Sequence, residues 1–150
     1  MRRVRAEREG VGDEQEGAVP LFGPIAGTDG GGVYVTGASS KVTSTLATTQ
    51  IKNNKAITAA GTGRGGGFAL FAGAEVELTA GTTTLNQAKR GGGVYVDAST
   101  FKMHTHTIGP TNKATVDDGG GLYLIRASLD ARTCAVSSNF AGRSGGGLFA

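Results

Sequence analysis

The chain has 150 residues, 27 of them glycine, with one cysteine and a formal net charge of +3 at pH 7, which is enough for one domain with its own core. Its lysines and arginines are dispersed and accompany no aromatic–basic module, so the composition argues against nucleic-acid binding. No apolar run approaches the roughly 20 residues that cross a bilayer, and the first residues lack the apolar stretch of a secretory signal. We therefore expect no membrane insertion and no export signal, and the lone Cys134 excludes an internal disulfide.

The first 29 residues fall into two parts. Residues 1–17 hold four arginines and five acidic residues among few apolar ones, and such a segment buries too little surface to offset its chain entropy. The composition predicts a disordered charged leader. Residues 18–29 contain Pro20 and Pro24, which donate no ladder hydrogen bond, so this segment is predicted to form an N-terminal cap or a partial coil.

From residue 30 onward the sequence repeats. Triplets of glycine occupy residues 30–32, 65–67, 91–93, 119–121 and 145–147, at spacings of 35, 26, 28 and 26 residues. A recurring period in this range is typical of a solenoid. Because glycine permits positive φ and a close approach of backbones, each triplet is predicted to make a tight turn.

Each triplet is followed by a short strand whose outer places are almost always aliphatic. With the period of two of a strand, these outer places should face the core and the middle place should face solvent. Tyr34, Tyr95 and Tyr123 are therefore predicted to be at least partly exposed. The side chains predicted to be buried are Val33, Val35, Phe68, Leu70, Val94, Val96, Leu122 and Leu124.

A second strand and an Asn-x-Ala corner complete each repeat. The second strands are expected near residues 42–44, 76–78, 101–103 and 129–131. Asparagine tolerates a left-handed backbone and can hydrogen-bond to an asparagine one coil away, which predicts a stacked side chain at a sharp corner. The corner motif begins at Asn54, Asn86, Asn112 and Asn139.

The repeat predicts an all-β fold. Three short strands and three corners per period describe a right-handed parallel β-helix over residues 30–150, with about four coils and the start of a fifth. The apolar spacing of a helix is absent, and glycine does not stand at every third position as collagen requires. An antiparallel sandwich would not explain why each repeat reuses the same residue at the same place.

The pattern GGG-V-Y-V, followed by N-x-A and a further GGG, resembles the pectin-lyase-like superfamily of right-handed parallel β-helices. Within that superfamily it is similar to the Gly-Gly-apolar and Phe-x-x-Asn repeats of polymorphic outer-membrane proteins and autotransporter passengers. The resemblance covers residues 30–150 and departs from the pattern at Thr83 and Gly109, where Ile51 and Val136 supply the apolar residue in other repeats. It implies an extracellular or cell-surface location.

The middle places of the first strands form a candidate binding column. Stacking the repeats aligns Tyr34, Tyr95, Tyr123 and Phe149, with a gap at Ala69. Exposed aromatic side chains can bind sugars or a partner protein. The alternative, which we favour, is that neighbouring aromatic side chains stabilise the sheet and one another.

A charged column is expected on the second strands. It runs Thr43, Glu77, Lys102, Asp130, with signs that alternate between adjacent coils. Like charges directly opposite one another destabilise a sheet, so this alternation supports the register of the coils. Exposed ion pairs contribute little to stability, and the column is predicted to be structural.

Two histidines and the cysteine are candidate metal ligands. His104 and His106 alternate along one expected strand, so both imidazoles are predicted to face the same side about 7 Å apart, with Cys134 beside His106 in the next coil. Three such groups could ligate zinc or copper. Because no fourth ligand shares their column, we expect no metal site and no cofactor.

Catalytic residues are not expected. Enzymes with the fold that the resemblance implies carry acidic clusters on an outer face, for calcium-assisted elimination or acid–base hydrolysis. The adjacent acids of the repeat, Asp117 and Asp118, precede a glycine triplet and are predicted to form a turn. Arg126 is the one candidate for the base of a lyase.

The function expected from the sequence is a non-catalytic repeat segment of a larger surface or extracellular protein, with an adhesion, binding or structural role and a carbohydrate or a protein as partner. The alternative is a polysaccharide lyase or glycosidase whose acidic site lies in coils outside this chain. Residues 145–150 begin a fifth coil with a single strand, so self-association through this open coil is also expected.

Overall fold

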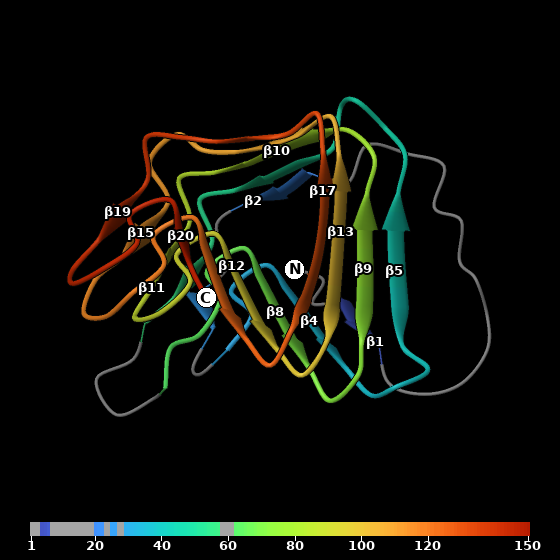
Figure 1. Ribbon diagram of the computed structural model, residues 1–150, viewed down its shortest axis with the longest axis horizontal. Helices are drawn as coiled ribbons and strands as arrows, with labels where there is room; N and C mark the ends of the chain where they lie inside the picture. Colours follow the sequence, from blue (N-terminus) through green and yellow to red (C-terminus); the bar gives the residue numbers. More distant parts are fainter. Residues whose placement is uncertain (1–3, 7–19, 23–24, 27–28, 58–61) are drawn as a thin grey trace.

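Successive coils of the chain stack into a parallel β-solenoid (Figure 1). The computed structural model describes residues 4–6, 20–22, 25–26, 29–57 and 62–150. Within these residues all extended regular structure is β-strand, and the strand pairs are parallel throughout. The same residues include no helix long and apolar enough to cross a membrane. The all-β solenoid predicted from the glycine repeat is confirmed.

A coil places one strand in each of four sheets, which we call first to fourth in order around the coil. The first sheet contains β1 (Val4–Ala6), β4 (Val33–Thr36), β8 (Phe68–Phe71), β12 (Val94–Asp97), β16 (Leu122–Ile125) and β20 (Leu148–Phe149). The second sheet contains β5 (Lys41–Ser44), β9 (Glu75–Leu78), β13 (Thr100–His104) and β17 (Ser128–Arg132).

The third and fourth sheets meet at the asparagine corner. The third sheet contains β2 (Pro20–Phe22), β6 (Gln50–Lys52), β10 (Gly81–Thr84), β14 (His106–Ile108) and β18 (Ala135–Val136). The fourth sheet contains β3 (Ile25–Ala26), β7 (Lys55–Ala56), β11 (Gln87–Ala88), β15 (Lys113–Ala114) and β19 (Phe140–Ala141). The expectation of three strands per coil is therefore wrong, because the asparagine corner separates two short strands in different sheets.

The core lies inside the coils and has the predicted register. Val94 pairs with Phe68 on one side and with Leu122 on the other, so like positions of the repeat stack along the solenoid. Burial of a Val, Leu or Phe side chain contributes about 1.5–3 kcal/mol, and the stacked positions form one continuous apolar cluster. The side chains confirmed as buried are Val33, Val35, Phe68, Leu70, Val94, Val96, Leu122 and Leu124.

The asparagine ladder is confirmed. The side-chain amide nitrogen of Asn86 donates to Oδ1 of Asn112 at 3.0 Å, and that of Asn112 donates to Oδ1 of Asn139 at 2.9 Å. The same amide groups also donate to backbone carbonyl groups, as Asn112 does to Thr83 at 2.8 Å. Asn54, Asn86 and Asn112 are fully buried, so these bonds satisfy polar groups that water does not reach.

The left-handed backbone at the corner lies one residue earlier than we expected. At each of these corners, the residue that precedes the ladder asparagine has a positive φ: Asn53 (58°), Leu85 (56°), Thr111 (66°) and Ser138 (53°). The ladder side chains thus act through hydrogen bonds, and their neighbours reverse the chain direction. A leucine and a threonine in this conformation are unfavourable, because their Cβ atoms approach the backbone.

The glycine triplets both turn the chain with a positive φ and allow backbones to approach closely, as predicted. The first glycine of each triplet has a φ between 59° and 69°. The later glycines bring adjacent coils together, and a Cβ added to Gly93 would lie 2.6 Å from the carbonyl oxygen of Gly121. Backbone hydrogen bonds follow these contacts, since the N–H of Gly93 donates to Gly120 at 3.1 Å.

Three strands precede residue 29. Strand β1 pairs with β4, β2 with β6 and β3 with β7, so they add a strand to three of the sheets. Three residues of the predicted leader, Val4–Ala6, thus lie in a strand, and the rest of residues 1–17 fall outside the described residues. Of residues 18–29, the described ones are the two strands and Asp29.

Candidate functional site

An aromatic ladder runs along the outer face of the first sheet. We define it as Tyr34, Phe71, Tyr95, Tyr123 and Phe149. Successive ring centroids lie 5.4, 5.5, 5.1 and 5.0 Å apart. This spacing is close to that of neighbouring strands, so the rings stack because the coils do. The predicted alignment of Tyr95 with Tyr123, and of Tyr123 with Phe149, is confirmed by the register.

Phe71 closes the gap that the sequence left at Ala69. Ala69 pairs with Tyr34 and Tyr95 in the predicted column. Phe71 lies two residues further along β8 and therefore on the same face, and its ring lies between those of Tyr34 and Tyr95. The period of two of a strand places Phe71 on the same face as Ala69, so the sequence contained a signal for this contact. The alignment of the repeats did not reveal it, because the ring enters from the adjacent column.

Tyr95 is buried, with 4% of its surface exposed, so the prediction of partial exposure is wrong for this residue. It is correct for Tyr34 and Tyr123. The rings of Phe71 and Tyr123 cover Tyr95 on two sides. Burial raises the pKa of the Tyr95 hydroxyl group, although a hydrogen bond with Arg64 partly opposes that shift.

The aromatic ladder presents mainly the edges of its rings to solvent. Tyr95 and Tyr123 are stacked with only 9° between their planes, and Tyr123 and Phe149 with 19°. A ligand that stacks on an aromatic side chain needs an open ring face. Since neighbours occupy the faces of the inner rings, the geometry favours the structural interpretation of the column. A binding role for Tyr34, Tyr95, Tyr123 and Phe149 stays a prediction.

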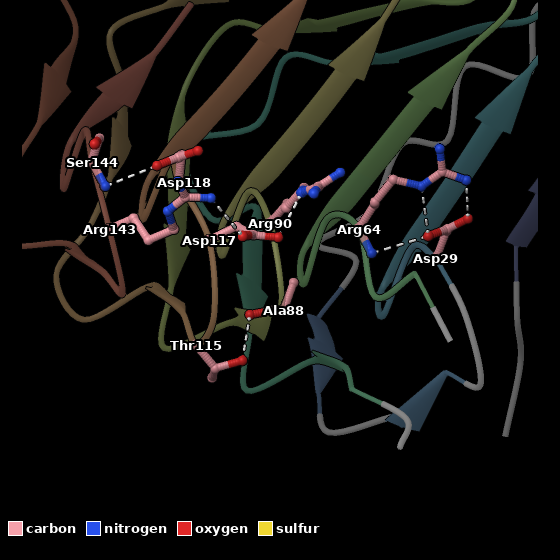
Figure 2. Close-up of polar contacts among 9 residues, drawn as sticks. All are labelled: Asp29, Arg64, Ala88, Arg90, Thr115, Asp117, Asp118, Arg143 and Ser144. Carbon is pink, nitrogen blue, oxygen red and sulfur yellow. Dashed lines mark hydrogen bonds and ion pairs between the residues drawn. The ribbon is translucent and has the colours of Figure 1, made fainter. Parts of the chain in front are cut away.

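Arg64 covers the middle of the ladder. Its guanidinium carbon lies 4.5 Å from the ring centroid of Phe71 and 5.4 Å from that of Tyr95. Asp29 holds this arginine by two hydrogen bonds, from Nε at 3.0 Å and from Nη2 at 2.8 Å (Figure 2). Burial alone would raise the Asp29 pKa, but hydrogen bonds from Arg64 and Thr62 outweigh it and lower that pKa.

Asp117 and Asp118 lie in a bend between β15 and the next glycine triplet, and both carboxylates have partners in the protein (Figure 2). Asp117 lies 2.7 Å from Nε of Arg90 and 3.5 Å from Nη1 of Arg143. Asp118 accepts a hydrogen bond from the backbone N–H of Ser144 at 2.9 Å. These contacts join consecutive coils where the fourth sheet leads into the next glycine triplet.

Arg126 does not pair with these acids. Its Nη2 lies 2.6 Å from Oδ1 of Asp97, in the turn between the first and second sheets. The candidate residues of a lyase site therefore belong to two separate groups of ion pairs and hydrogen bonds, one with Asp117 and Asp118 and the other with Arg126.

The two histidines lie on different sheets, so the prediction that both imidazoles face the same side is wrong. Thr105, with φ of 50°, turns the chain between β13 and β14. His104 is partly exposed, whereas His106 is fully buried. The Nδ1 of His106 lies 2.8 Å from the carbonyl oxygen of Ala80, and its Nε2 lies 2.9 Å from Oγ1 of Thr83.

Cys134 lies directly before β18, whose Ala135 pairs with Thr107, the residue after His106; the alignment of Cys134 with His106 itself stays a prediction. Its thiol donates to the carbonyl oxygens of Met103 at 3.1 Å and of Arg132 at 3.2 Å. Among the described residues, no group of three or more His, Cys, Asp and Glu side chains could hold a metal ion.

The charged column of the second sheet has the predicted register but different ion pairs. Glu77 is adjacent to Lys102, and Lys102 to Asp130. Yet Lys102 pairs with Glu75 at 3.0 Å, and Asp130 pairs with Arg132 on its own strand at 3.0 Å. Long lysine and arginine side chains reach neighbours along the diagonal of a sheet, which residue alignment alone did not predict.

Lys41 completes this network, with nitrogen–oxygen distances of 2.8 Å to Glu75 and 3.5 Å to Glu77. Hydrogen bonds from Lys41 and Lys102 lower the Glu75 pKa.

Comparisons with known proteins found no matching family model, no matching curated protein and no matching solved structure. A functional proposal therefore depends on the side chains and their contacts.

Proposed function

We propose that this chain is a non-catalytic β-solenoid segment of a larger surface-displayed or extracellular protein, with an adhesion, binding or structural role. One observation carries the proposal. Between residues 29 and 150, the seven aspartate and glutamate side chains are all engaged in the contacts that join the coils or stabilise a strand. Six lie in ion pairs and Asp118 accepts a backbone hydrogen bond.

Such carboxylates suit stability better than catalysis. A glycosidase needs two carboxyl groups across its substrate, one with a raised pKa so that it can donate a proton. Here hydrogen bonds with basic side chains lower the pKa of Asp29 and Glu75. A lyase needs a base that faces acids in an open site, and Arg126 is already bound to Asp97.

The cell-surface part of the proposal depends on the resemblance of the glycine and asparagine repeats to autotransporter passengers and polymorphic outer-membrane proteins. A stack of coils with laddered side chains on its inner and outer faces suits a segment that holds other regions away from a surface.

A cleavage assay tests the proposal. The purified chain would be incubated with acidic and neutral polysaccharides, with and without calcium, while new reducing ends and unsaturated sugar products are measured. We expect no product above the level seen with heat-denatured protein. The variant Asp117→Asn/Asp118→Asn should give the same result, since there is no activity to remove.

Product formation by the parent that is lost in this double variant would contradict the proposal. It would support a polysaccharide lyase or glycosidase instead. The double variant must first be confirmed as folded by circular dichroism.

A further inference from the structure

The charges of the solenoid are divided unequally between its sides. The second sheet contains three basic and three acidic side chains, which ion pairs connect: Lys41, Glu75, Glu77, Lys102, Asp130 and Arg132. The strands of the third and fourth sheets contain no aspartate or glutamate, and all of these strands are among the described residues. They contain Lys52, Lys55 and Lys113.

These three lysines point outward. Ile51, Ala56 and Ala114 are buried, so the residues that alternate with them face away from the core. Lys55 and Lys113 are exposed and both pair in register with residue 87 of β11, so they lie about 10 Å apart along one outer column. No described carboxylate forms an ion pair with any of the three.

Exposed apolar side chains lie on the same side. Among the described residues, five large apolar side chains are exposed, and three of these belong to the fourth sheet or its flanking turns. Phe140 continues the outer column of Lys113 and is 60% exposed. Leu85 stands at the asparagine corner and is 41% exposed, and Val116 follows β15 and is 53% exposed.

The fourth sheet and the second sheet lie on opposite sides of the coil (Figure 1). Lys55 and Lys113 therefore face away from the side with balanced charges, and Lys52 ends β6 at the corner that leads into the fourth sheet. At the end of the fourth sheet the nearest acid along the chain, Asp117, lies between Arg90 and Arg143, so its charge is offset.

We propose that this side, which we call the basic face and define by Lys52, Lys55, Lys113, Leu85 and Phe140, docks on an anionic lipid surface. Basic side chains attract anionic headgroups, while exposed Phe and Leu side chains enter the boundary between headgroups and acyl chains. A hydrated soluble polyanion would use the lysines but gain nothing from the apolar residues. This proposal does not depend on the absence of catalysis.

Vesicle sedimentation tests it with the full chain. The probes are vesicles of phosphatidylcholine alone and of phosphatidylcholine mixed with phosphatidylglycerol, at low and high salt. We expect binding to the anionic vesicles that weakens at high salt, because screening reduces the attraction of each lysine. The variant Lys52→Gln/Lys55→Gln/Lys113→Gln should lower the partition coefficient on the order of 100-fold at low salt.

A matched control removes three positive charges from the second sheet and the bend that leads into it. The variant Lys102→Gln/Arg126→Gln/Arg132→Gln has the same net charge as the test variant, and its partition coefficient should stay close to that of the parent. Phe140→Ser should weaken binding at both salt concentrations, because the apolar contribution is not screened. Circular dichroism and thermal melts establish that each variant is folded.

Three results would overturn the proposal. The first is no binding of the parent to anionic vesicles. The second is an equal loss of binding in the test and control variants, which would indicate a response to net charge alone. The third is tighter binding of dextran sulfate than of anionic vesicles, which would assign the basic face to a soluble polyanion.

Discussion

Asn112 illustrates how a single buried polar residue joins three coils. Its Oδ1 accepts from the backbone N–H and the side-chain amide of Asn86, each at 3.0 Å, and its own amide donates to Asn139 and Thr83. The sequence predicted this ladder, because four repeats place the same residue type at the same position. It did not predict which residue takes the left-handed conformation, since φ at a corner depends on how the two flanking strands leave it.

Replacing Asn112 by leucine should strongly destabilise the fold. Asn112→Leu leaves the buried backbone N–H of Asn86 without its acceptor and removes the side-chain bonds to Asn86, Asn139 and Thr83, at a cost of about 3 kcal/mol in the free energy of unfolding. Urea denaturation measures the change. Asn139→Leu is the matched control at the partly exposed end of the ladder and should cost less. An unchanged denaturation midpoint for Asn112→Leu would contradict the ladder's role.

Leu85 should be a position where a substitution stabilises the protein. Its φ of 56° is unfavourable for leucine, and its side chain is 41% exposed. Asparagine adopts this conformation more readily, so Leu85→Asn should raise the free energy of unfolding by about 0.5–1 kcal/mol. Thr84→Asn, one residue earlier within β10, is the control and should lower it, because asparagine is unfavourable in a strand. A lower melting temperature for Leu85→Asn would contradict this expectation.

His106 should make stability depend on pH. Burial lowers its pKa in the folded state, although the hydrogen bond to Ala80 opposes that shift. The unfolded chain then binds the proton more readily than the folded one, so the stabilising contribution is present above the ordinary pKa of about 6.5 and is lost as pH falls below it. For one titrating group, the free energy of unfolding changes by at most about 1.4 kcal/mol per pH unit.

Urea denaturation between neutral and mildly acidic pH measures this dependence, and imidazole resonances in NMR assign it. His104→Gln is the control, because His104 is partly exposed and its removal should leave the dependence in place. If the His106 resonances titrated at the ordinary pKa, the burial argument would fail.

At the scale of elements, the aromatic ladder shows what a repeat can and cannot predict. The column of Tyr34, Tyr95 and Tyr123 follows directly from aligning the glycine triplets. The burial of Tyr95 does not, because it depends on a ring that enters from the neighbouring column and on Arg64 above it. Strands of two residues, such as β7 and β11, are also too short to carry a period of two, so the fourth sheet was not predicted.

Ala69 and Phe71 should behave as a compensating pair. Ala69 is fully buried and leaves space for the Phe71 ring. Ala69→Tyr restores the aromatic residue of the repeat but places two rings in one space, so it should destabilise the fold by about 1–3 kcal/mol. Adding Phe71→Thr, which copies Thr36 in the preceding coil, should recover most of this loss. Thermal melts of the single and double variants test this, and an additive loss in the double variant would contradict it.

At the scale of the whole molecule, each coil contacts its neighbours through the same ladders, so stability accumulates along one axis. The last strands of the four sheets, β20, β17, β18 and β19, each have a neighbour on one side only among the described residues. No further described strand pairs with their outer edges, and Leu148 of β20 is 45% exposed. An open strand edge with apolar side chains is a template for pairing with another chain.

The final prediction is that copies of this chain associate through that edge in a concentration-dependent manner. Light scattering on the purified chain should show growth in mass with concentration. Leu148→Lys should reduce it, because a charge at the edge of β20 opposes the approach of a second strand. Ile125→Lys is the matched control: Ile125 is 38% exposed on the same sheet, but β16 already has strands on both sides. A monomer at every concentration, or equal effects of the two lysine variants, would show that the edge is not the contact.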